Sequence, residues 1–170
     1  MTSYVALLRA VNLGPTNQMP KAALTAIGEA CGFAQVRTYI ASGNLLFASD
    51  EDEATVKATL EARLAVHAGK PIPAIIRTAA ELAAIRDGNP FPDAPGNRVI
   101  AILLDAPPSL DALAHARHVA GEQMALGSRE LYIRYTDTGM GQSKLIVPAA
   151  KAGTGRNMNT IAKLAMLSRR

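Results

Sequence analysis

The sequence contains no tryptophan and a single cysteine, Cys31, among its 170 residues. One cysteine cannot form an internal disulfide, which favours a reducing compartment. Cys31 and three scattered histidines form no recurrent zinc-binding pattern, so we expect neither a metal nor a cofactor. There is no apolar run of about 18 residues that could span a bilayer, and no signal-peptide pattern opens the chain. These absences predict a cytoplasmic protein without a membrane partner.

The composition is that of a globular protein, with 49% hydrophobic and 19% charged residues. Its length suits one domain or two small, closely packed halves. The formal net charge is +4, and the positive charge is concentrated toward the C-terminus. Residues 129–170 contain eight lysines and arginines against two acidic residues. This distribution favours an anionic partner for the C-terminal part of the chain.

Hydrophobic patterns predict the element order βαββαβ for the first half, residues 1–78. The turn Ala41–Asn44 separates two short apolar runs, and Gly43 can adopt the positive φ that a tight hairpin needs. Ser49 or Asp50 is expected to cap the second helix, and Gly69 to end it. This order is the ferredoxin-like pattern. Strands are expected at 4–11, 36–40, 45–48 and 72–77, and helices at 20–31 and about 50–67.

The second half, residues 79–170, predicts a related but incomplete βαββα order. Residues 144–147 either supply the missing strand or begin a helix that Pro148 disrupts. Although the two similar orders suggest a duplication, no residue-level repeat is visible. The fold class is therefore α+β, with two subdomains in one compact unit. Helices are expected at 80–86, 109–118 and from about Thr154, and strands at 99–104, 122–126 and 131–135, with a Pro/Gly-rich connection at 87–97.

The most informative stretch is residues 154–160, Thr-Gly-Arg-Asn-Met-Asn-Thr. If it opens a helix, the helical spacing groups polar side chains on one face and apolar ones on another. A helix start with free N–H groups and a cationic face is suited to binding an anion. The polar face would hold Arg156, Asn159, Thr160 and Lys163, and the apolar face Met158, Ile161, Ala162 and Ala165.

Three segments together resemble the bacterial domain-of-unknown-function family 1697. They are Arg9–Gly14 (R-A-V-N-L-G), Thr38–Phe47 (T-Y-I-A-S-G-N-L-L-F) and Thr154–Leu164 (T-G-R-N-M-N-T-I-A-K-L). The resemblance implies a two-part α+β fold and no activity, because the family's function is not established. The chain departs from the family pattern at Ala10 and Pro15, where glycine is usual, and at Met158, where tryptophan is usual.

The candidate ligand residues come from these segments and from one loop lysine. Structural alternatives are also open: Asn12 suits a turn, and Ser42 and Asn44 suit a hairpin. Thr154 could cap the last helix, with Asn157 closing a capping-box contact. We expect the first-strand residues to lie beside the C-terminal segment in space. No acid or base accompanies them, so catalytic residues remain unassigned. The candidates are Arg9, Asn12, Ser42, Asn44, Lys144, Arg156, Asn157, Asn159, Thr160 and Lys163.

The leading hypothesis is binding of a phosphate-bearing small ligand or nucleotide. Nucleic acid fits less well, because the chain offers few aromatic side chains for base stacking. An enzyme acting on a small anionic substrate and a protein-interaction module are the alternatives. An arginine in the first turn of a helix opposes the helix dipole, so the substitution Arg156→Ala is expected to weaken binding while costing little stability.

Overall fold

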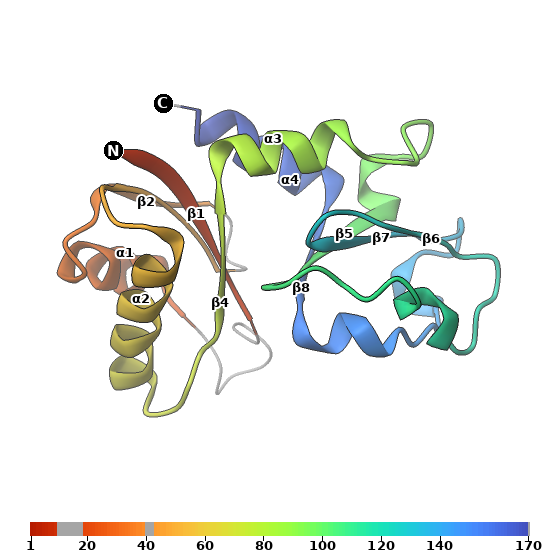
Figure 1. Cartoon of the computed structure of the whole chain (residues 1–170), viewed down its shortest axis with the longest axis horizontal. Coiled ribbons are helices and arrows are strands. Elements are labelled where there is room, and N and C mark those ends of the chain that lie inside the picture. The colour runs from red at the N-terminus through yellow and green to blue at the C-terminus, as the bar shows by residue number, and fades with distance from the viewer. Residues whose placement is uncertain (10–18, 40–42, 170) are drawn as a thin grey trace. The chain divides into compact units, whose positions relative to one another are not determined.

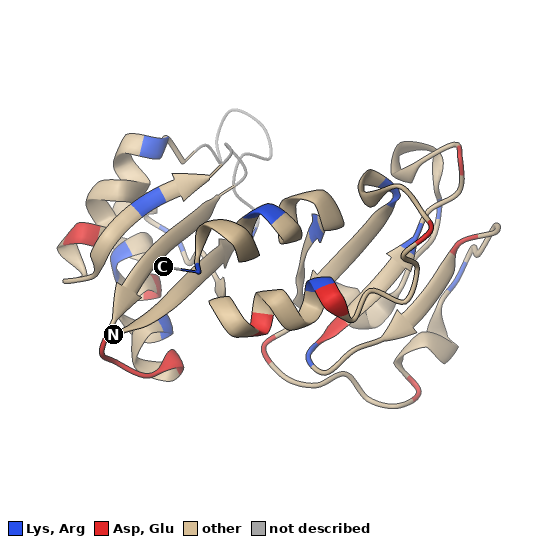
Figure 2. Ribbon diagram, turned by 90° about the horizontal axis from the view of Figure 1, so that it is seen from above, with Lys and Arg blue, Asp and Glu red and all other residues tan. Residues whose placement is uncertain are grey.

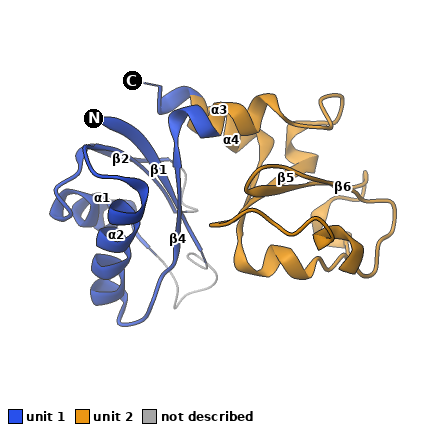
Figure 3. Ribbon diagram, in the orientation of Figure 1, with its two compact units in different colours: residues 1–81, 166–170 blue, residues 82–165 orange. Residues whose placement is uncertain are grey.

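The computed structural model describes residues 1–9, 19–39 and 43–169 (Figure 1). The chain divides into two compact units, Met1–Glu81 with Met166–Arg170, and Leu82–Ala165 (Figure 3). Helices α3 (Ala79–Asp87) and α4 (Met158–Leu167) each cross the boundary between the units. The candidate residues Asn12 and Ser42 lie outside the described residues.

The first unit confirms the predicted ferredoxin-like order. Its four strands form one antiparallel sheet in the order β2-β3-β1-β4. Two helices cover one face of this sheet (Figure 1). The elements are β1 (Thr2–Leu8), α1 (Lys21–Ala30), β2 (Ala34–Tyr39), β3 (Asn44–Ser49), α2 (Glu53–Ala68) and β4 (Ala74–Thr78).

Alternate residues of the first sheet build its core against the helices. Tyr4 and Phe47 join that core, and Phe47 stacks on Phe33 with ring centroids 4.1 Å apart. On β1, Tyr4, Ala6 and Leu8 face this core. The alternate residues Val5 and Leu7 are also fully buried, so the strand is buried on both faces. Such strands have continuous apolar runs rather than alternating ones, which is the pattern that predicts β1.

Helix α2 begins and ends at residues with specific cap geometry. The Thr55 backbone N–H donates to Asp52 Oδ1 at 2.8 Å, so Asp52 is the N-cap. The prediction of Ser49 or Asp50 is wrong, because Ser49 Oγ instead accepts from the Glu51 N–H at 3.1 Å, before the helix. The expected end at Gly69 is confirmed, with φ at 70° in the left-handed region.

The second unit contains a complete four-stranded antiparallel sheet, in the order β6-β7-β5-β8. The prediction that this half lacks a strand is therefore wrong. The missing strand is β8, residues 154–157, which the sequence had suggested as the start of the last helix. The strands are β5 (Val99–Leu103), β6 (Gln123–Leu126), β7 (Glu130–Arg134) and β8 (Thr154–Asn157).

The first sheet is covered by two α-helices, whereas short 3₁₀ turns take their place in the second unit. The predicted helix 109–118 is a single 3₁₀ turn, Ala112–His115. Residues 144–147 form neither strand nor helix: Ile146 makes an isolated antiparallel bridge with Arg117, whose N–H donates to the Ile146 carbonyl at 2.8 Å. This pairing holds both segments extended, which excludes the helical conformation there. Leu113, Leu145 and neighbouring side chains still cover the apolar face.

Candidate functional site

The two sheets share the same pairing register, which reveals a repeat at the residue level. On the central strand of the first sheet, Val5 pairs with Leu46 on one side and Arg77 on the other. In the second sheet, Ala101 pairs in the same way with Tyr132 and Arg156. The two arginines therefore occupy equivalent positions on the equivalent edge strands β4 and β8.

A turn hydrogen bond confirms this correspondence independently. The Leu8 N–H donates to the Gly43 carbonyl at 2.9 Å, and the equivalent Leu104 N–H donates to the Arg129 carbonyl at 2.8 Å. A trace of the repeat is present in the sequence, where Leu-Leu-Arg-Ala at 7–10 corresponds to Leu-Leu-Asp-Ala at 103–106. Four residues are too few to stand out as a repeat in the sequence alone.

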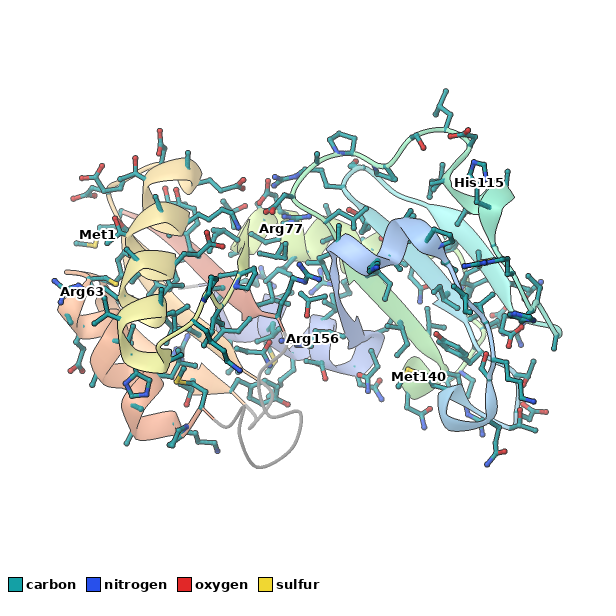
Figure 4. All side chains as sticks on the ribbon, turned by 90° about the horizontal axis from the view of Figure 1, so that it is seen from below. Met1, Arg63, Arg77, His115, Met140 and Arg156 are labelled. Carbon is teal, nitrogen blue, oxygen red and sulfur yellow. The ribbon has the colours of Figure 1, made fainter. Side chains whose placement is uncertain are left out.

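Both equivalent arginines, which are labelled in Figure 4, are buried. They also make the same main-chain contact. Arg77 Nη1 donates to the Ile76 carbonyl at 2.9 Å, and Arg156 Nη1 donates to the Gly155 carbonyl at 2.8 Å. Each guanidinium thus satisfies the carbonyl of the preceding residue on a strand at the edge of its sheet. Unpaired carbonyls at sheet edges can recruit other strands, so this contact also protects the edge.

Each of these arginines is followed directly by a helix N-cap. Thr78 and Glu81 form a capping box on α3, with the Glu81 N–H donating to Thr78 Oγ1 at 3.1 Å and the Thr78 N–H donating to Glu81 Oε2 at 2.7 Å. At α4 the Thr160 N–H donates to Asn157 Oδ1 at 2.9 Å. Asn157 is therefore the cap of α4 itself. The expectation that Thr154 caps this helix is wrong, because Thr154 lies on strand β8.

The sequence had suggested that Arg156 lies in the first turn of a helix. That expectation is wrong, because Arg156 lies on strand β8. Its Nη1 also donates to Thr154 Oγ1 at 2.9 Å, because residues two apart on a strand share one face. Burial lowers the pKa of the guanidinium to about 10, since the charged form is poorly solvated there. The side chain still carries its positive charge at neutral pH.

Asn159 and Lys163 are exposed one turn apart on α4. Asn159 has a close neighbour in Gly96, within the short 3₁₀ turn Gly96–Arg98: a Cβ atom added at residue 96 would lie 2.0 Å from Asn159 Oδ1. Gly96 is thus required for the close approach of the Asn159 amide. Thr160 is half-buried and takes part in the cap through its N–H.

The start of α4 is electropositive. Helices α2 and α3 carry Glu53 and Glu81 in their first turns, which offset the positive end of each helix dipole. Helix α4 has no acidic residue in its first turn, and Arg156 precedes it. Helix α1 also has no acidic residue in its first turn and begins at Lys21. The described helix α4 differs from it in that a buried arginine, Arg156, precedes the acid-free start.

The remaining candidate residues are distributed differently. Asn44 is fully buried, and its Nδ2 donates to the Tyr39 carbonyl at 3.0 Å, which favours the structural alternative of a hairpin residue. The half-exposed Arg9 follows β1, and its backbone N–H donates to the Pro73 carbonyl at 2.9 Å. Lys144 is exposed, whereas its neighbour Ser143 donates to Glu122 Oε2 at 2.5 Å. The expected meeting of the first strand with the C-terminal segment stays a prediction.

Within the part of the chain that the structure describes, no group of three or more His, Cys, Asp or Glu side chains could hold a metal ion. No helix within it is long and apolar enough to cross a bilayer.

The fold defines an α+β protein with two ferredoxin-like sheets and a cationic strand–helix junction in the second. The chain belongs to the DUF1697 family of proteins of unknown function, whose profile it matches over residues 1–132. A solved structure of a conserved bacterial protein from Streptococcus pneumoniae is similar, with a TM-score of 0.79 at 21% identity; the match covers 100% of this chain and 99% of that chain. This likeness shows the fold alone. No curated protein matches the sequence.

Proposed function

We propose that the protein binds a small phosphate-bearing ligand, such as a nucleotide, at the junction of β8 and α4. The observation that carries the proposal is the acid-free start of α4, which directly follows Arg156. The helix dipole and the guanidinium both favour an anion there. Asn159 in the first turn of α4 and Lys163 one turn further along are both exposed.

Each residue of the junction has a distinct part in this proposal. Lys163 supplies the exposed positive charge that a phosphate would contact. The Asn159 amide can donate and accept, so it suits the polar edge of a base or sugar. Arg156 acts mainly through its field, because its Nη1 already donates to Thr154 and Gly155. A cytoplasmic location, expected from the single cysteine, belongs to the same proposal.

A small ligand suits the described residues better than a nucleic acid strand. Lys and Arg are interspersed with Asp and Glu along the described parts of both units (Figure 2), whereas strand binding needs a basic surface that follows the phosphate backbone. Tyr4 and Phe47 belong to the core of the first unit and cannot serve as stacking platforms.

Binding is tested by thermal shift and calorimetry of the full chain with inorganic phosphate, AMP and ATP. We expect a rise in Tm with at least one of these ligands, because a ligand that binds only the native state stabilises it. Replacing Lys163 with Gln should raise the dissociation constant of that ligand by about ten-fold, the loss of affinity expected when one charged contact is removed.

The matched control is Lys21→Gln, which removes one exposed lysine from α1, also a ten-residue helix. This variant should bind as the wild type does. Equal losses in both variants would indicate a general charge effect and contradict the proposed site. A wild-type protein whose Tm responds to none of the phosphates would contradict the function itself.

A further inference from the structure

An apolar groove lies between α1 and α2, within the first unit. Its volume is about 660 Å³. This lies within the range of about 300–1,000 Å³ that is typical of small-molecule pockets. Both helices place their large apolar side chains, including Leu24 and Leu60, toward the sheet, so the groove opens on their outer side.

The groove exists because its walls are built from the smallest side chains. Ala23, Ala26 and Ala30 line it from α1, at the spacing that places them on one helix face. Ala62 lines it from α2. An alanine side chain ends at Cβ, so the space between the two outer helix faces is left unfilled. Ala23 also packs against the core, whereas Ala26, Ala30 and Ala62 are exposed, so larger residues at these three positions would close the groove from its outer side.

Three further lining residues of α2 give the groove an apolar rim, from Val66, and a positively charged side chain, Arg63, with His67 beside it. Val66 is 85% exposed at its edge, which leaves a large apolar side chain in contact with water. Arg63 and His67 also line the groove, and Arg63 lies on the outer side of the helices (Figure 4). The whole lining belongs to the described residues and contains no Asp or Glu. A ligand complementary to it has an apolar body and an anionic group.

We propose that this groove binds a single-chain carboxylate amphiphile, such as a fatty acid. The hydrocarbon chain would lie along the alanine walls and cover Val66, and each methylene buried contributes about 0.8 kcal/mol. The carboxylate would accept hydrogen bonds from the Arg63 guanidinium, whose planar fork matches a carboxylate. His67 lies one turn further along α2 and provides a second donor.

The proposal is tested by calorimetric titration of the full chain with dodecanoate, kept below its micelle concentration. Two further probes separate the contributions: butyrate has the same head group without the chain, and dodecyltrimethylammonium has the same chain with a cationic head. We expect one molecule of dodecanoate per chain, and binding at least about ten-fold weaker for each of the other two. Equal affinity for the carboxylate and the ammonium amphiphile would overturn the proposal.

Variants then locate the site. The substitution Ala26→Leu fills the groove, and Arg63→Gln removes the guanidinium that lines it. Each substitution should lower the affinity for dodecanoate by about ten-fold or more. The control is Ala54→Leu, which adds the same side chain at an exposed position of α2 outside the groove. Ala26→Leu binding as tightly as the wild type would contradict the location.

The oligomeric state distinguishes a protein partner from a lipid. Light scattering of the wild type and of Ala26→Leu, without amphiphile, should show the same mass. A wild-type dimer that Ala26→Leu converts to a monomer would show that a second copy of the chain occupies the groove, and would overturn the proposal. Neither result bears on phosphate binding at α4.

Discussion

Arg77 and Arg156 hold equivalent positions in the two sheets, and each donates from Nη1 to the carbonyl oxygen of the residue before it, at 2.9 and 2.8 Å. The exposed fractions of the two side chains are 2% and 9%. A contact that recurs at equivalent positions of the two sheets indicates a structural role. The unit that repeats is an edge-strand arginine followed by a helix N-cap.

This role changes the expected effect of Arg156→Ala. The substitution should lower the free energy of unfolding by about 1–3 kcal/mol, because it removes the hydrogen bonds that Arg156 Nη1 donates to Thr154 Oγ1 and to the Gly155 carbonyl. Urea unfolding monitored by circular dichroism measures the change. The control is Arg134→Ala on β7, which removes an exposed arginine that donates to Gln123 Oε1 at 2.7 Å and should cost much less. Equal stability of Arg156→Ala and the wild type would restore the original interpretation of Arg156 as a mainly ligand-binding residue.

The first unit was predictable because its local signals agree with its tertiary structure. The continuous apolar run at Tyr4–Leu8 predicts a buried strand, and Gly69 marks the end of α2. The helix stripe Val56, Leu60 and Leu64 is buried as its spacing predicts. In each case, neighbouring residues in the sequence carry the information.

Strand β8 could not be predicted in this way. Its two buried side chains are Thr154 and Arg156, so the four residues show no alternation of apolar and polar types. Their burial is possible because the arginine donates to both a hydroxyl and a carbonyl oxygen. The pairing partner of Arg156 is Ala101, which is distant in sequence. Pairing with β5 therefore makes residues 154–157 a strand, although the local sequence pattern had predicted the start of a helix.

The candidate site was predicted in part. The polar segment around Asn157 does precede a helix, but the helix begins at Met158, and Asn157 serves as its cap. The neighbour of Asn159, Gly96, was missed because it lies in a loop with no periodic pattern. The loop's Pro/Gly-rich composition predicts a connection and carries no information about which helix it touches.

Gly96→Ala should test the contact between the loop and α4. The new Cβ would lie 2.0 Å from Oδ1 of the exposed Asn159, so this amide must turn away and lose its present contact, and we expect a loss of stability of about 1 kcal/mol or less. The double variant Gly96→Ala/Asn159→Ala should recover part of that loss, because the clashing amide is then absent. Gly141→Ala is the control, since nothing lies within 4 Å of its added Cβ. Additive effects of the two single changes would contradict the contact.

The cap of α2 predicts a specific dependence of stability on pH. The Thr55 N–H donates to Asp52, and this hydrogen bond lowers the pKa of the Asp52 carboxyl below its ordinary value. The unfolded chain therefore binds this proton more readily than the native one. The resulting stabilisation is complete above the ordinary pKa of aspartate, about 3.9, and is lost as pH falls through the lower native value.

The substitution Asp52→Asn isolates this effect, because asparagine also caps helices but does not titrate. We expect the Tm of the wild type to fall more steeply than that of Asp52→Asn as the pH is lowered from about 5 toward 2.5, with the difference arising below the ordinary pKa of aspartate. Thermal unfolding followed by circular dichroism across this range provides the measurement. Asp93→Asn, which changes an exposed carboxyl outside any helix, is the control and should follow the wild-type curve. Parallel curves for the wild type and Asp52→Asn would show that the charge of the cap contributes nothing to α2, and that its geometry alone stabilises the helix.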